Sequence, residues 1–131
     1  MNQASNRKSK VFYAVNILTS LSFLMAGVLK LMAHEQMVTV FTKFELPLEL
    51  MYLVGVAEVL GAIALWMPKL TVLSAFGLVL AMVGAFLFHF TYDPFDKTIP
   101  AVVLIAFLIF IIKVRMKENN EFIGQYFNSR K

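Results

Sequence analysis

The sequence predicts an all-α membrane protein, with four transmembrane helices packed into one bundle. Hydrophobic residues make up 60% of the 131 positions, charged residues make up only 15%, and the mean hydropathy is +0.75. These values lie outside the range of ordinary soluble domains. Four apolar runs also approach the length of about 20 residues that an α-helix needs to cross a bilayer.

The apolar runs cover Val11–Ala33, Leu48–Met67, Leu70–Phe90 and Ile99–Val114. We expect the first run to be retained, because it is too long, and its continuation too apolar, for a cleaved signal peptide. Only a tight hairpin separates the second run from the third, so these two must pack antiparallel. The fourth run is short and holds large aliphatic residues with Phe107 and Phe110, which predicts a wall that faces lipid.

Polar ends and one amphipathic loop complete the predicted organisation. Residues 1–10 form a frayed cytoplasmic tail, residues 11–114 the transmembrane domain, and residues 115–131 a second cytoplasmic tail. A short amphipathic helix is expected in this second tail, around Phe122–Phe127. In the first outer loop, apolar residues recur at helical spacing and predict a short interfacial helix: Met37, Val40, Phe41 and Phe44.

Basic residues are concentrated on one side of the predicted bundle. Nine of the twelve fall on the side that both termini share, whereas Lys30, Lys43 and Lys97 fall on the other. By the positive-inside rule, both termini are then cytoplasmic and the protein lies in the cytoplasmic (inner) membrane. The net charge of +4 thus reflects topology and contact with membrane lipid, and we expect no nucleic-acid partner. The nine are Arg7, Lys8, Lys10, Lys69, Lys113, Arg115, Lys117, Arg130 and Lys131.

The chain contains no cysteine. This excludes thiol exchange, disulfides, iron–sulfur clusters and thiolate zinc sites, so any such redox chemistry must come from a partner. The eight methionines are scattered without a cluster that would bind a metal. We expect no metal site, no intrinsic cofactor and no enzyme activity of the chain on its own.

Glu58 is the most informative residue, because it lies near the middle of an apolar run. An unpaired carboxylate at that depth is costly, so Glu58 should be neutral, paired or facing a cavity. Small residues one turn away, Gly55, Gly61 and Ala62, would allow a neighbouring helix to approach the same face. Glu58 is therefore predicted to point into the bundle.

The first and third runs each combine a stripe of small or polar residues with one ionisable group. In the first run, Gly27 and Lys30 end a stripe that begins at Asn16. In the third, small residues at four-residue intervals lead to a histidine: Gly77, Ala81, Ala85 and His89. These stripes predict close packing of the first three helices.

Whether Lys30, Glu58 and His89 contact one another depends on how deep each lies in the membrane. Lys30 and His89 should lie near the outer membrane surface, whereas Glu58 lies about 15 Å along the second helix. Contact between Lys30 and Glu58 stays open. Each group also has a structural alternative: Glu58 as a neutral acid that fixes packing, Lys30 as a snorkelling side chain, and His89 as a polar end of its helix.

Several short motifs resemble those of DoxX and DoxX-like small membrane proteins, over about residues 12 to 114. One departure is Glu45, where the family has Gly before Leu-Pro, and it leaves open how sharply the chain turns there. The matching pieces are Gly27-x-x-Lys30-Leu31, Phe44-x-Leu46-Pro47, Gly55-x-x-Glu58-x-x-Gly61-Ala62, Pro68, Gly77-Leu78, Met82-x-Gly84-Ala85-x-x-x-His89 and Pro100-Ala101-Val102-Val103-Leu104.

The resemblance implies a four-helix membrane bundle and only a broad range of roles. Members of the wider family resemble subunits of a thiosulfate:quinone oxidoreductase or parts of membrane complexes that answer oxidative stress. A eukaryotic branch resembles an assembly chaperone for ligand-gated channels.

We consider three hypotheses for function. The first is an accessory subunit of a quinone-linked membrane redox system that binds a quinone or other apolar ligand between the first three helices. Lys30 or His89 would bond its carbonyl, and Glu58 would relay a proton. The second is a non-catalytic assembly factor with a membrane-protein partner or a homo-oligomer, docked through the small-residue stripes. The third is a small proton-coupled carrier.

Overall fold

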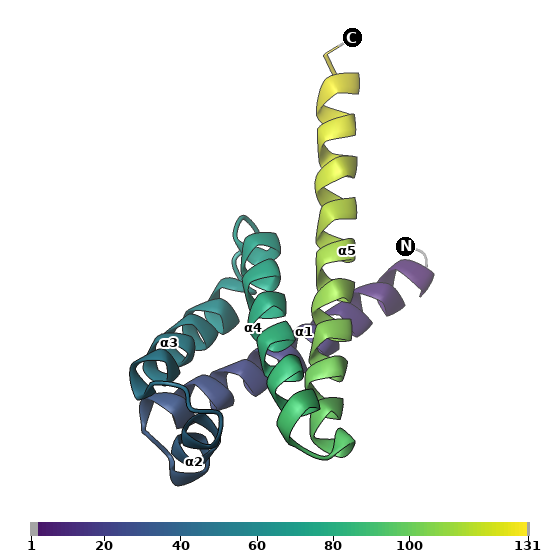
Figure 1. The fold of residues 1–131 in the computed structure, drawn as a ribbon. Coiled ribbons are helices and arrows are strands. Elements are labelled where there is room, and N and C mark those ends of the chain that lie inside the picture. The colour runs from purple at the N-terminus through teal and green to yellow at the C-terminus, as the bar shows by residue number, and fades with distance from the viewer. Residues whose placement is uncertain (1–2, 131) are drawn as a thin grey trace.

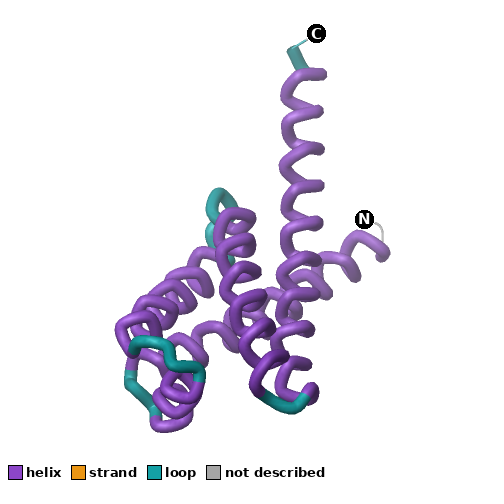
Figure 2. Tube along the Cα trace, in the orientation of Figure 1, coloured by secondary structure: helices purple, strands orange, loops and turns teal. Residues whose placement is uncertain are grey.

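The computed structural model describes residues 3–130, which form helices joined by short loops (Figures 1 and 2). No strand occurs within this part of the chain, so the predicted all-α class is confirmed. In chain order the elements are α1 (Gln3–Leu31), α2 (Glu35–Lys43), α3 (Leu48–Ala64), α4 (Thr71–Tyr92), the 3₁₀ helix η1 (Phe95–Thr98) and α5 (Ile99–Asn128).

Three stretches are long and apolar enough to cross a membrane: α1, α4, and η1 together with α5. Helix α3 has 17 residues, or about 25 Å of axial length. The hydrocarbon core of a bilayer is about 30 Å thick. The chain is therefore a membrane protein with three helices of spanning length, and a fourth span at Leu48–Met67 stays a prediction.

The helices associate as two pairs, with α1 packed mainly on α3 and α4 packed mainly on α5. Figure 1 shows that the α1/α3 pair lies across the α4/α5 pair rather than alongside it. Smaller contacts of α3 with α4 and of α1 with α5 join the pairs. The structure is thus two crossed helical hairpins, and a groove lies between α3 of one and α4 of the other.

Two helices extend beyond the apolar runs that predict them. Helix α1 begins at Gln3, so the expectation of a frayed tail is wrong for residues 3–10. Helix α5 continues to Asn128, so the expected separate helix around Phe122–Phe127 is its last part. No proline interrupts either polar extension, and good helix formers such as Lys, Arg, Glu and Gln propagate a helix that has already begun.

The apolar core lies where the two pairs cross. Helix α5 contributes Leu108, Ile111 and Ile112 to it, so the prediction that this run is only a lipid-facing wall is wrong. Large aliphatic side chains pack equally well against lipid and against protein, and hydropathy does not distinguish the two. The other buried members are Phe12, Phe23, Ala62, Leu65, Ala75 and Leu78.

Helices α1 and α2 both end in a Schellman motif whose left-handed residue is not glycine. At the end of α2, Glu45 has φ 54°, its N–H donates to Thr42, and the Leu46 N–H donates to Phe41. Ala33 has φ 49° after α1. Glycine usually occupies this position, because it alone adopts positive φ without strain. The sharp turn that the Gly-to-Glu45 departure left open is therefore present.

Helices α1 and α3 make backbone contact at Gly27 and Gly55. A Cβ atom added at Gly27 would lie 2.8 Å from the Gly55 carbonyl oxygen, and one added at Gly55 would lie 3.0 Å from the Gly27 carbonyl oxygen. Gly61 faces a side chain instead: a Cβ atom added there would lie 2.8 Å from Cδ2 of Leu78 on α4. At all three glycines a larger side chain would press on the neighbouring helix.

The stripe on α4 behaves differently. Gly77 is exposed, and a Cβ atom there would meet nothing within 4 Å among residues 3–130. Ala81 and Ala85 are partly buried. Gly77 therefore makes no close helix contact within residues 3–130, and its small size leaves open space beside α4.

Replacing Gly27 by Ala should destabilise the fold, because the added methyl group would press on the backbone of α3. We expect a loss of about 1–3 kcal/mol, as for other overpacked positions. Gly84→Ala is the matched control, since a Cβ atom there meets nothing within 4 Å and alanine favours a helix. Unfolding in detergent, followed by circular dichroism, measures both variants. Equal stability of the two would contradict the backbone contact.

Candidate functional site

Lys30 and Glu58 form a buried ion pair between α1 and α3. The Lys30 Nζ donates to Glu58 Oε2 at 2.8 Å, and the side chains are 12% and 1% exposed. Both residues follow the two glycines of the backbone contact by three positions. The close approach of the helices therefore brings the ammonium and the carboxylate together.

The relative position of α1 and α3 explains how a lysine near a helix end reaches an acid in the middle of a run. Gly55 lies opposite Gly27 and within contact of the Lys30 side chain. Helix α3 thus begins beyond the end of α1, and its first turns, from Leu48, extend past Leu31. The sequence did not decide whether Lys30 contacts Glu58. The contact forms because the first turns of α3 extend beyond the last turn of α1, so Lys30 lies beside α3.

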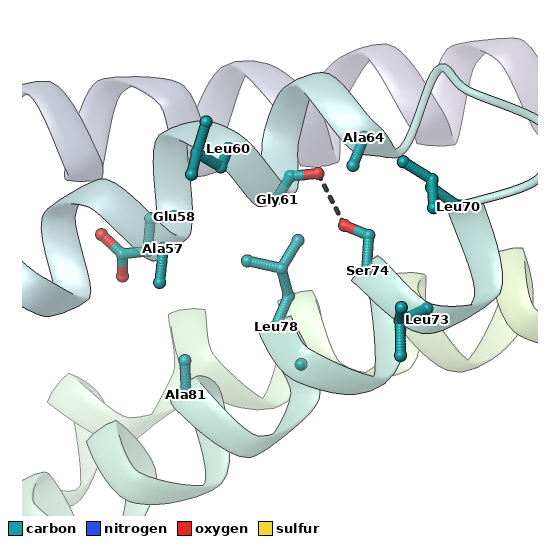
Figure 3. A pocket seen from close by; sticks show the side chains of 11 residues that line it. Ala57, Glu58, Leu60, Gly61, Ala64, Leu70, Leu73, Ser74, Leu78 and Ala81 are labelled. Atoms are coloured by element: carbon teal, nitrogen blue, oxygen red, sulfur yellow. Dashed lines mark hydrogen bonds between the residues drawn. The ribbon is translucent and has the colours of Figure 1, made fainter.

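Glu58 also lines an open groove between α3 and α4 with a volume of about 270 Å³. In Figure 3, Glu58 lies near Ala57 and Ala81 at one end, and Ser74 lies toward the other. The Ser74 hydroxyl donates to the Gly61 carbonyl oxygen at 2.7 Å and joins the helices there. The remaining lining residues are apolar: Leu60, Ala64, Leu70, Leu73, Gly77 and Leu78.

His89 belongs to a second polar cluster, which we call the outer bridge: Lys43, Phe44, Phe88, His89 and Asp93. His89 Nδ1 lies 2.7 Å from Asp93 Oδ2, and Lys43 at the end of α2 donates to Asp93 Oδ1. Phe44 stacks on Phe88 with ring centroids 5.3 Å apart. The structure therefore brings Lys30 and Glu58 together and gives His89 a different acidic partner.

Asp93 is the residue of this bridge that sequence reasoning missed. Its pKa lies below its usual value, first because of the hydrogen bond from Lys43 and then because of the bond with His89. The available signal was the spacing of four residues between His89 and Asp93, which places both on one helix face.

A buried polar group near the middle of α1 was predicted only as part of a stripe. Asn16 is 1% exposed and donates to the Leu65 carbonyl oxygen at 3.5 Å. Nearby, Trp66 Nε1 donates to Ser20 Oγ at 2.9 Å. These bonds tie α1 to the end of α3, so Trp66 helps to hold the two helices together.

The ion pair should show strong coupling in a double-mutant cycle. Lys30→Met leaves a buried carboxylate without a partner, which costs about 3–5 kcal/mol. Lys30→Met/Glu58→Leu removes both charges and should recover most of that loss. Unfolding in detergent micelles measures all variants. Additive losses in the double variant would show that the two side chains do not interact.

The outer bridge should loosen in acid. Because the pKa of Asp93 is below the ordinary value of 3.8, the ionised carboxylate stabilises the folded state above pH 3.8. This contribution is lost as the pH falls through the lowered pKa. The chain has no cysteine, so spin labels at Thr39→Cys on α2 and Thr91→Cys on α4 are specific.

The distance between these labels should lengthen when the wild-type protein is acidified below the lowered pKa of Asp93. With Asp93→Asn added, the distance should already be long at pH 7 and should not change with acid. If the distance in the wild-type protein does not change with pH, Asp93 does not hold α2 against α4.

With this geometry in place, comparisons with known proteins identify the family. No curated protein and no solved structure matches the chain. The sequence pattern of the DoxX-like family matches residues 14–111, which include Lys30, Glu58, His89 and the glycines of the helix contact. The family match covers most of the chain and all four of the predicted apolar runs in large part. The chain belongs to the DoxX-like family.

Proposed function

We propose that this DoxX-like membrane protein is an accessory subunit of a quinone-linked redox system. It binds a small apolar ligand in the groove between α3 and α4, and Glu58 relays a proton at the groove's end. One observation carries the proposal: Glu58, a buried acid, lines a groove whose other lining residues are all apolar except Ser74. Ligand sites in proteins commonly combine apolar walls with very few polar groups, which orient the ligand.

The open side of the groove fits a ligand that arrives from the membrane. Gly77 and Leu73 line it and are exposed on α4, a helix long and apolar enough to lie in lipid. A quinone has an apolar tail that partitions into acyl chains and a polar ring that needs a hydrogen-bonding partner. Glu58 supplies such a partner inside the protein.

The proposal makes the chain a binding subunit and not an enzyme on its own. With no cysteine in the sequence, electrons for a bound quinone come from a partner protein. In the proposed topology both termini lie in the cytoplasm at the inner membrane, because nine of the twelve basic residues fall on that side.

A role in membrane-protein assembly is the second candidate, and the exposed Gly77 favours it. Small residues on a helix surface let another helix approach closely, and no residue of the described chain occupies this surface. The first candidate is preferred because assembly by helix packing gives no role to a carboxylate at the groove's end.

Filling the groove tests the proposal. Gly77→Leu should fit without a clash and occupy the space, and should weaken binding of a short-tailed quinone by about tenfold or more, which is about 1.4 kcal/mol. Gly84→Leu places the same side chain on the same helix, outside the groove lining, and should bind like the wild type. Quenching of the single tryptophan, Trp66, in lipid nanodiscs measures binding.

Equal quenching of wild type and Gly77→Leu would overturn the groove as the ligand site. If Gly77→Leu instead abolishes capture of a membrane-protein partner while quinone binding is absent in both proteins, the assembly role replaces the redox role.

A further inference from the structure

The groups expected to hold a carbonyl oxygen, Lys30 and His89, do not line the groove. Lys30 Nζ donates to Glu58 Oε2, and His89 bonds to Asp93. Ser74, the remaining polar side chain of the groove, donates its hydroxyl to the Gly61 carbonyl oxygen. A ligand that presents only acceptor atoms would therefore find no side-chain donor free in the groove.

The group that stays available is an acceptor. Among residues 3–130, Lys30 is the one hydrogen-bond partner of the Glu58 carboxylate, and it takes Oε2. Oε1 of the same carboxylate has no donor within this part of the chain. The Glu58 side chain is 1% exposed, so a donor group on a bound ligand is the partner that its position allows.

The charge of the site further restricts which ligand headgroups can bind. Lys30 and Glu58 neutralise each other, and no other charged residue lines the groove. A cationic headgroup would leave one net charge in apolar surroundings, and an anionic headgroup would face the carboxylate. A neutral hydroxyl group satisfies Oε1 without changing the net charge.

We propose that the groove selects ligands with a neutral hydroxyl donor on an apolar body, such as a phenol or a hydroquinone, over the matching ether or quinone. This inference rests on the proposed function, since it concerns the same groove. The direction of the hydrogen bond differs from the one expected from the sequence. There, Lys30 or His89 would donate to a ligand carbonyl, whereas here the ligand donates to Glu58. The reduced form of a quinone then binds more tightly than the oxidised form.

A matched pair of probes tests this selectivity without redox chemistry. A 4-alkylphenol and its methyl ether have the same ring and tail and differ in the single donor. The wild-type protein in lipid nanodiscs should bind the phenol about tenfold more tightly than the ether, because a hydrogen bond to a charged acceptor is stronger than one between neutral groups. Equilibrium dialysis against labelled probes measures both, with nanodiscs that contain no protein giving the lipid background.

The Lys30→Met/Glu58→Leu variant keeps the groove neutral and removes the acceptor. It should bind phenol and ether equally, whereas Gly84→Leu should keep the preference of the wild type. Equal binding of the two probes to the wild type, or tighter binding of the ether, overturns the hydroxyl selectivity and leaves the groove as a ligand site. Binding that Gly77→Leu does not reduce for either probe overturns the proposed function as well.

Discussion

Backbone contact between α1 and α3 at Gly27 and Gly55 sets the positions of the charged groups inside this protein. At this separation, the Lys30 side chain needs to reach only one turn along α3 to meet Glu58. A larger residue at either glycine would move the helices apart and would lengthen the ion pair. Because a charge in apolar surroundings is tolerated only with a partner, the two glycines make the buried acid possible.

Much of the secondary structure follows from the sequence, and the tertiary arrangement does not. Apolar runs locate α1, α3, α4 and α5, because hydropathy records which residues avoid water. It does not record whether an apolar residue faces lipid or protein, so the burial of Leu108 and Ile111 could not be predicted. The crossing of the two hairpins is set by side-chain packing at the core and has no signal in hydropathy.

The sequence predicts which residues belong to the candidate site, but it does not predict how the helices that carry them are aligned. Small residues around Glu58 and Lys30 predicted a shared interface, but their contact depends on how far α3 extends beyond α1. That offset is set by α2 and by two tight turns, whose left-handed residues are Ala33 and Glu45. Glycine at these two positions would have predicted the turns from the sequence. His89 lies near the end of its helix as expected, and its partner is Asp93, four residues further along the chain.

The groove persists because α3 and α4 are joined directly at one end, are connected through α2 at the other, and are not filled between. At one end, the short turn after α3 and the bond from Ser74 to Gly61 hold the helices together. At the other, the outer bridge connects the end of α2 to α4. Gly77 lies between these points with no neighbour in the described chain, so the helices cannot close the gap by side-chain packing. A ligand that enters there meets fixed walls and one oriented carboxylate, and such preorganisation lets a single hydrogen bond determine which headgroup is bound.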